Sequence, residues 1–136
     1  MKYKIALQLS EEGYSVSVPG LPGCWSQGAS EEEAIANIQD AIRKYLAADR
    51  AHEGRRGSRD RSSALGVGKL PGVSHQRAVQ ALERAGFRVL RQGKHIVMTD
   101  GVRILTVPRG NPINAFTMGG IIRDAGLTIE DFRRLL

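Results

Sequence analysis

Residues 13–37 read GYSVSVPGLPGCWSQGASEEEAIAN, and this stretch decides the fold of the N-terminal part of the chain. Residues 14–18 alternate apolar and polar side chains, which is typical of a strand with one buried face. Residues 19–23 hold two prolines and two glycines, so they predict a turn and exclude the interior of a strand or helix. Residues 24–27 then have the length of a third short strand.

A helix is predicted to follow this third strand. Ser30 and Glu33 have the spacing of a capping box, and the acidic run that ends at Glu33 suits the positive end of a helix. The apolar residues that follow recur at helical spacing: Ala34, Ile35, Ile38, Ala41, Ile42, Tyr45 and Leu46. This stripe predicts an amphipathic helix that packs on the sheet.

The residues before this stretch complete a small sheet. Residues 3–9 alternate like a strand, and Glu12-Gly13 predicts a hairpin turn between the first two strands. We therefore expect a domain over residues 1–48 with the order β-β-β-α. Because a domain of this size buries too little surface to be more than marginally stable, we expect it to dock on the rest of the chain or to oligomerise.

The segment DRAHEGRRGSRDRSSALGVGK, residues 49–69, predicts a linker. It is rich in Gly, Ser and Arg and poor in apolar side chains. It is long enough to let the two ends of the chain meet within one molecule or to reach a neighbouring chain. Its arginines are open to two interpretations, a solvated tether or a contact with phosphate.

Residues 70–136 predict a second α+β domain with the order α-β-β-β-α-α. Asp100-Gly101 predicts a two-residue hairpin turn, and residues 109–116 predict a loop after a strand that Pro108 ends. The expected elements are a helix from the Ser74 cap to Gly86, strands 87–91, 94–99 and 102–107, a helix over 117–125 and a short helix after Thr128.

The charge is distributed unevenly along the chain, which has a formal net charge of +6. Residues 1–50 carry five Lys/Arg against seven Asp/Glu, and residues 70–136 carry ten against five. A basic domain attracts nucleic acid through its phosphates, and an acidic companion can compete for the same surface. The alternative is a set of solvated arginines with no nucleic-acid partner.

Several classes of protein are disfavoured. No apolar run has the length of a membrane span, and the N-terminus does not read as a secretory signal peptide. One cysteine, Cys24, excludes an internal disulfide and a cysteine-built metal site. We therefore expect a cytoplasmic protein with no membrane association, no cofactor and no metal.

The N-terminal motifs resemble a known family. The segment from Gly13 to Pro19, the turn Leu21-Pro22-Gly23-Cys24 with the Trp-Ser-Gln-Gly that follows it, and then Glu32-Glu33-Ala34 and Asn37 are similar to the core of HicB antitoxins. The resemblance covers about the first 48 residues. It implies a partial RNase H-like fold and a protein that covers the active surface of a partner toxin.

The C-terminal motifs resemble the partner of that family, the HicA toxin. The matching segments are Leu70-Pro71, residues 81–87, residues 91–95, residues 106–108 and residues 121–127. The resemblance implies a fold like that of double-stranded-RNA-binding domains and an endoribonuclease that cleaves mRNA. The chain thus looks like an antitoxin core joined by a linker to its toxin, which are usually separate proteins.

The resemblance assigns the catalytic role to His95. The imidazole can exchange a proton near neutral pH, and RNA supplies its own nucleophile, the 2′-hydroxyl, so cleavage is possible without a metal ion. Arg91, Lys94 and Arg109 are the candidates to bind phosphate. Lys94 stands where the family has a serine, and Arg109 stands where many relatives carry a second histidine. Arginine cannot exchange protons near neutrality, which opens the alternative of a weakened toxin.

Two more residues are candidates for contacts. Arg123, on the predicted helix 117–125, is expected to reach a phosphate in a groove of RNA. Trp25 is expected either to anchor an interface or to pack in the core. His52 and His75 show no metal-ligand spacing with His95, and we expect both to be structural or solvent-facing.

Three functions remain open at this point. The first is a single-chain toxin–antitoxin protein whose C-terminal ribonuclease is masked by its N-terminal part, within one chain or between the chains of an oligomer. The second is an RNA-binding protein of the same fold that has lost catalysis. The third is an autoregulatory nucleic-acid-binding protein, although no helix-turn-helix segment follows either core.

Overall fold

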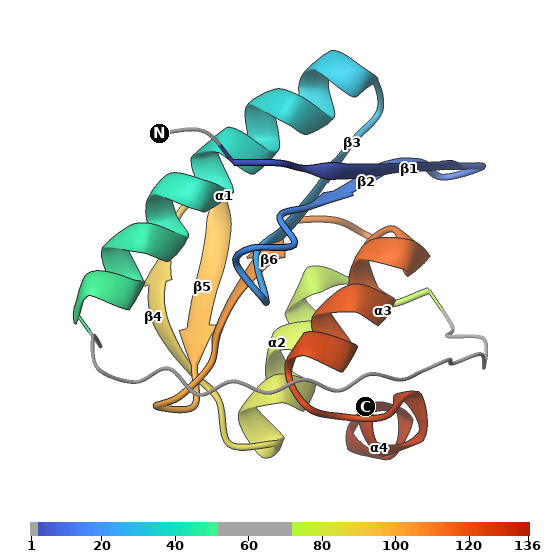
Figure 1. Ribbon diagram of the computed structural model, residues 1–136. Helices are drawn as coiled ribbons and strands as arrows, with labels where there is room; N and C mark the ends of the chain where they lie inside the picture. Colours follow the sequence, from blue (N-terminus) through green and yellow to red (C-terminus); the bar gives the residue numbers. More distant parts are fainter. Residues whose placement is uncertain (1–2, 52–71) are drawn as a thin grey trace.

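The computed structural model describes residues 3–51 and 72–136 as a mixed α+β structure with two three-stranded antiparallel sheets (Figure 1). The first sheet has the order β1-β2-β3 and the second the order β4-β5-β6. The N-terminal half contains β1 (Ala6–Ser10), β2 (Gly13–Ser17), β3 (Trp25–Gly28) and α1 (Glu31–Ala51). The C-terminal half contains α2 (His75–Arg84), β4 (Arg88–Gln92), β5 (His95–Thr99), β6 (Ile104–Pro108), α3 (Ala115–Asp124) and α4 (Ile129–Leu135). The predicted orders β-β-β-α and α-β-β-β-α-α are confirmed.

The start of α1 follows the predicted capping pattern. The backbone N–H of Glu33 donates to Oγ of Ser30 at 3.1 Å, and the carboxylate of Glu33 accepts from the N–H of Ala29 at 2.7 Å. The first bond satisfies one of the donors that a helix N-terminus leaves free, and the second goes to Ala29, one residue before the N–H of Ser30 that a complete capping box would use. The helix then packs its small and branched side chains on the first sheet, with Ala34 and Ile38 buried beside Val16.

The two halves share a core. The cluster around α1 takes in Val97 of β5 and Ile104 of β6, so α1 covers one face of both sheets. The opposite face of β5 and β6 is covered by the C-terminal helices, which bury Met98 and Leu105. Since both faces of β5 and β6 are covered, all residues of these two strands are buried. The expectation that the small halves would need a partner surface is met within the chain.

Several boundaries differ from the sequence-based prediction. The first strand begins at Ala6 and not at residue 3, and α1 continues to Ala51, so residues 49–51 of the predicted linker are helical. Helix α3 begins at Ala115, two residues before its predicted start, because the side chain of Asn114 accepts from the N–H of Phe116 and caps it. The rest of the predicted linker, and residues 70–71, lie outside the described residues.

The predicted two-residue turn at Asp100-Gly101 is a longer loop. Thr99 pairs with Ile104, so residues 100–103 form the connection between β5 and β6. The carboxylate of Asp100 accepts from the N–H groups of Val102 at 2.9 Å and Arg103 at 2.7 Å. An aspartate that bonds to the backbone two and three residues ahead stabilises this wider turn. Pro108 is the last residue of β6, so this strand ends one residue later than predicted.

Candidate functional site

A seam between the halves runs along β3 and β6. Cys24 and Thr106 form a parallel bridge, and the N–H of Thr106 donates to the carbonyl of Gly23 at 2.9 Å. The hydroxyl of Thr106 accepts from the N–H of Trp25 at 2.9 Å and donates to its carbonyl at 2.8 Å. The Leu-Pro-Gly-Cys turn thus places the start of β3 next to β6 of the second sheet.

Gly23 is the residue that permits this approach. Its φ is +96°, which favours glycine, and a Cβ at this position would lie 2.0 Å from the carbonyl oxygen of Ile104. Any side chain at residue 23 would therefore collide with the backbone of β6. This steric requirement gives a physical reason for the glycine in the turn.

Trp25 contacts α3 across the seam. Its indole N–H donates to Oδ2 of Asp124 at 2.8 Å, and the same oxygen accepts from the N–H of Gly23 at 2.9 Å. The ring lies against Gly120, where a Cβ would stand 1.9 Å from the indole. The guanidinium of Arg123 lies 6.0 Å from the ring centroid. Trp25 is therefore a contact between the two halves.

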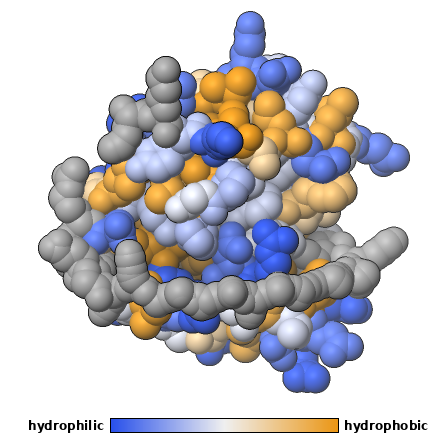
Figure 2. All heavy atoms as spheres, in the orientation of Figure 1, coloured by the Kyte–Doolittle hydropathy of each residue, from blue (hydrophilic) through white to orange (hydrophobic). Residues whose placement is uncertain are grey.

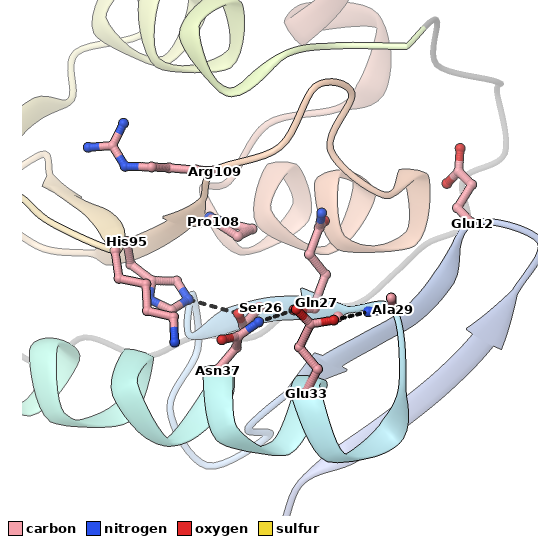
Figure 3. A pocket seen from close by; sticks show the side chains of 11 residues that line it. Glu12, Ser26, Gln27, Ala29, Glu33, Asn37, His95, Pro108 and Arg109 are labelled. Carbon is pink, nitrogen blue, oxygen red and sulfur yellow. Dashed lines mark hydrogen bonds between the residues drawn. The ribbon is translucent and has the colours of Figure 1, made fainter.

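His95 begins β5 and is buried at the same seam, with a relative exposure of 2%. Its Nε2 lies 2.8 Å from Oγ of Ser26 on β3, and its Nδ1 lies 3.0 Å from Oδ2 of Asp40 on α1. Figure 3 shows the ring directed at Ser26. Both ring nitrogens of His95, which belongs to the C-terminal half, thus bond to side chains of the N-terminal half.

The electrostatics of this group favour a neutral imidazole. Burial lowers the pKa of His95, and the bond to Asp40 opposes this shift, while the nearby ammonium groups of Lys94 and Lys44 lower the pKa further. Burial alone would raise the pKa of Asp40, but its hydrogen bonds with His95 and Lys44 give a net lowering. A neutral ring that donates Nδ1–H to Asp40 leaves Nε2 to accept the hydroxyl proton of Ser26.

A cleft of about 420 Å³ opens beside His95, and both halves line it. The C-terminal half contributes the cationic side chains of Lys94 and Arg109, and the N-terminal half contributes the carboxylates of Glu12 and Glu33. In Figure 3, Arg109 and Glu12 lie on opposite sides of this cleft. Nε of Arg109 donates to the carbonyl of Gly93 at 2.7 Å. The cleft therefore has one basic and one acidic wall.

The structure brings together some of the predicted site residues and leaves others apart. Lys94, His95 and Arg109 meet at the cleft. Arg91 is exposed on β4 and does not line it. Arg123 is also outside the cleft, over the ring of Trp25, with a side-chain exposure of 63%.

Glu12 makes a second contact across the seam. Its Oε1 accepts from the N–H of Ala115, the first residue of α3, at 2.7 Å. The amide of Gln27 accepts in the same way from the N–H of Asn114 at 2.8 Å. Because the N-terminus of a helix carries partial positive charge, Glu12 places a favourable anion there. Sequence reasoning did not identify either residue.

His75 and Cys24 do not line the cleft. His75, in the first turn of α2, bonds through Nδ1 to the backbone of Gly110, and its Nε2 lies 3.5 Å from the guanidinium of Arg109. His52 lies outside the described residues. Cys24 is fully buried, and burial raises the pKa of its thiol to about 12. Within residues 3–51 and 72–136, no three His, Cys, Asp or Glu side chains are grouped to hold a metal ion, and no helix is long and apolar enough to cross a membrane.

Comparison with known proteins gives the N-terminal half its family. Residues 3–62 match the family model of HicB-like antitoxins of bacterial toxin–antitoxin systems. The chain is 45% identical over 53 residues to the UPF0150 protein Ta0767 of Thermoplasma acidophilum, which is 77% of that protein and 38% of this chain. It is 48% identical over 46 residues to a UPF0150 protein of Helicobacter pylori, 64% of that protein and 34% of this chain.

A third similar protein is the uncharacterised 14.9 kDa protein of the rep-hol intergenic region of Haemophilus phage HP1. The two chains are 45% identical over 46 residues, 35% of the phage protein and 34% of this chain. No solved structure matches the chain. The family match ends at residue 62, before α2. Through these N-terminal residues, the chain belongs to the HicB-like antitoxin family of bacterial toxin–antitoxin systems.

Proposed function

We propose that this chain is a single-chain toxin–antitoxin protein. Residues 1–48 are the antitoxin domain, with a partial RNase H-like fold, and residues 49–69 connect it to the toxin. Residues 70–136 are a HicA-like toxin domain with a fold like that of double-stranded-RNA-binding domains. The element order α2-β4-β5-β6-α3-α4 and the HicA-like motifs support the assignment of the second domain.

The environment of His95 is the observation that carries this proposal. Its exposure is 2%, and its two nitrogens are occupied by Ser26 and Asp40 of the antitoxin half. Cleavage of RNA needs one group to take the proton of the 2′-hydroxyl and a group to protonate the departing 5′-oxygen. A histidine whose nitrogens are both bonded and buried can do neither. The antitoxin half thus silences the residue that the chemistry needs.

Masking within one chain needs only modest contacts. Because the two halves are covalently joined, the inhibitor is present at a high effective concentration. The antitoxin half is also net acidic and the toxin half net basic, so their long-range attraction favours docking. The carboxylate of Glu12, which accepts a hydrogen bond at the positive N-terminus of α3, is one such attraction between the halves.

The RNA-binding residues in this proposal are Arg91, Lys94, Arg109 and Arg123. All four are exposed, and Lys94 and Arg109 flank His95 at the cleft. An exposed guanidinium or ammonium group can pair with a phosphate oxygen without the loss of any bond inside the protein. In the undocked toxin they would hold the phosphate on which His95 acts and stabilise the charge that develops there.

A substitution that creates a steric clash between the two halves tests the proposal in the full chain. A Cβ on Gly120 would stand 1.9 Å from Cζ2 of Trp25, so Gly120→Ala forces the antitoxin half away from α3. The neighbouring Gly119 has open space at its Cβ, so Gly119→Ala is the matched control. We expect the Gly120→Ala protein to cleave labelled RNA in EDTA, and the wild type and Gly119→Ala proteins not to cleave it.

The double variant Gly120→Ala/His95→Ala identifies the residue responsible. It should bind RNA like Gly120→Ala but not cleave it. Circular dichroism must show that each variant retains its helices and strands. If folded Gly120→Ala binds no RNA and cleaves none, the proposal is wrong.

The second candidate is an RNA-binding protein without catalysis. It is favoured by Lys94 and Arg109, which supply charge at the cleft but do not exchange protons near neutral pH as a second histidine would. In that case Gly120→Ala would bind RNA without cleaving it. An autoregulatory role would instead appear as preferential binding of the chain's own promoter DNA over RNA.

A further inference from the structure

The two sheets differ at their outer edges, which are β1 and β4. Strand β4 carries Arg88 and Arg91, and its register shifts between Val89 and Arg91. Charges and such irregularities are the usual protection of an edge strand against pairing with another chain. Strand β1, with the sequence ALQLS, has no charge, and its register with β2 is regular throughout. It is an unprotected edge.

Strand β1 also exposes apolar side chains. Leu9 is 61% exposed and Leu7 is 36% exposed. Their cross-strand partners, Tyr14 and Val16, lie on the face that α1 covers, but α1 packs over β2 and β3 and not over β1. Figure 2 shows apolar side chains gathered in the upper part of the view, where Figure 1 draws β1. Among the residues that the structure describes, this leaves a leucine pair beside a strand edge that no other strand pairs with.

The register shows which backbone groups face outward. Ser10 and Gly13 flank the two-residue turn of the hairpin, so they form a hydrogen-bonded pair. Hydrogen bonding alternates along an antiparallel strand, so Ser10, Gln8 and Ala6 direct their N–H and C=O groups to β2. Leu7 and Leu9 therefore direct theirs away from the sheet.

We propose that β1 pairs antiparallel with β1 of a second copy of this chain, about a two-fold axis at Gln8. In this register Leu7 of each copy exchanges backbone bonds with Leu9 of the other, which uses the outward groups of both. The same register brings Lys4 of each copy beside the hairpin turn of the other, where Glu11 is exposed, so opposite charges lie close together at both ends. One continuous sheet then runs through both copies and buries the leucine pairs.

The pairing is independent of the proposed ribonuclease and of the seam. It uses the outer edge of the first sheet, whereas the seam uses β3 at the opposite edge. Both copies can therefore keep their halves docked while they associate. A homodimer of this kind has an isologous interface, in which the same strand serves on both sides.

Cysteine cross-linking of the full chain tests the register. Gln8 faces Gln8 across the axis as a pair without hydrogen bonds, where Cβ atoms are close enough for a disulfide. We expect Gln8→Cys to form a covalent dimer on mild oxidation. Ala6→Cys, two residues along the same exposed strand, is the matched control and should stay monomeric on a denaturing gel. The native Cys24 is fully buried and does not compete.

Mass measurement by light scattering tests the association itself. The wild type should have twice the chain mass of 14.8 kDa. Leu9→Lys should raise the dissociation constant of the dimer by about tenfold or more. Leu90→Lys on β4, where the leucine is 37% exposed, should leave it unchanged. A monomeric wild type, or equal cross-linking of Gln8→Cys and Ala6→Cys, would overturn the proposal.

Discussion

Oδ2 of Asp40 lies 3.0 Å from Nδ1 of His95, although 55 residues separate them along the chain. The bond joins the antitoxin family's helix α1 to the first residue of β5. His95 is nearly inaccessible, and burial lowers the pKa of its imidazole. The carboxylate of Asp40 opposes this lowering through its hydrogen bond and its charge. Several measurable consequences follow from this pair and from the seam around it.

Replacement of Asp40 should destabilise the chain according to what the new side chain can accept. Asp40→Ala leaves Nδ1–H of a buried imidazole without a partner, which costs about 1–3 kcal/mol. Asp40→Asn keeps an oxygen that can accept this proton, so its cost should be smaller. Urea unfolding measures both, and Asp49→Ala, an exposed aspartate on the same helix, should change the free energy of unfolding very little. Equal effects of all three variants would contradict the role of the bond.

The stability of the chain should fall as the pH drops below about 6.5. That is the ordinary pKa of histidine, and the folded His95 has a lower one, so the unfolded chain binds a proton that the folded chain does not. The contribution is complete above pH 6.5 and decreases at up to about 1.4 kcal/mol per pH unit between the two pKa values. Asp40, whose pKa is lowered from 3.8, adds a further loss only in more acidic solution.

Urea unfolding at a series of pH values from 5 to 8 measures this slope. His95→Gln has no imidazole to titrate, so its stability should change much less between pH 5 and 7 than that of the wild type. A wild-type stability that stays constant over this range would show that His95 is not held neutral by burial.

Gly23→Ala should be one of the most damaging small substitutions in the chain. It adds a methyl group at a positive φ and 2.0 Å from the carbonyl oxygen of Ile104, so the turn and β6 must separate. We expect a loss of about 2–4 kcal/mol in the free energy of unfolding. Gly20→Ala, in the same turn but with open space at its Cβ, is the control and should stay close to the wild type.

Much of the fold could be predicted because its signals are local. The capping pair Ser30 and Glu33 marks the start of α1, and the period-two pattern marks β2. The boundaries that were missed depend on bonds that the pattern does not contain. Asn114 caps α3 two residues earlier than the apolar pattern suggests, and Asp100 organises a wider turn than Asp-Gly alone predicts.

The site was predictable only in the C-terminal half. Lys94, His95 and Arg109 are close in sequence or on adjacent strands, so motif and spacing could bring them together. Ser26 is 69 residues from His95, and no local rule connects them. Asp40 offered one signal, because it shares a helix face with Asn37 and Lys44 beside the apolar stripe. The partner of Asp40 could not be predicted, because His95 reaches this helix face only in the docked arrangement of the two halves.

The chain should unfold in one cooperative step despite its two halves. Val97 and Ile104 of the second sheet are buried in the core that α1 forms with the first sheet, so separation of the halves exposes apolar side chains of both and docking adds to the stability of each. Trp25 is the single tryptophan, and its contacts with Gly120 and Asp124 place it on the seam. Its fluorescence therefore reports undocking, while far-ultraviolet circular dichroism reports the helices. We expect the two signals to change at the same urea concentration. A fluorescence change well before the loss of helix would mean that the halves separate while still folded, as a toxin released from its inhibitor would.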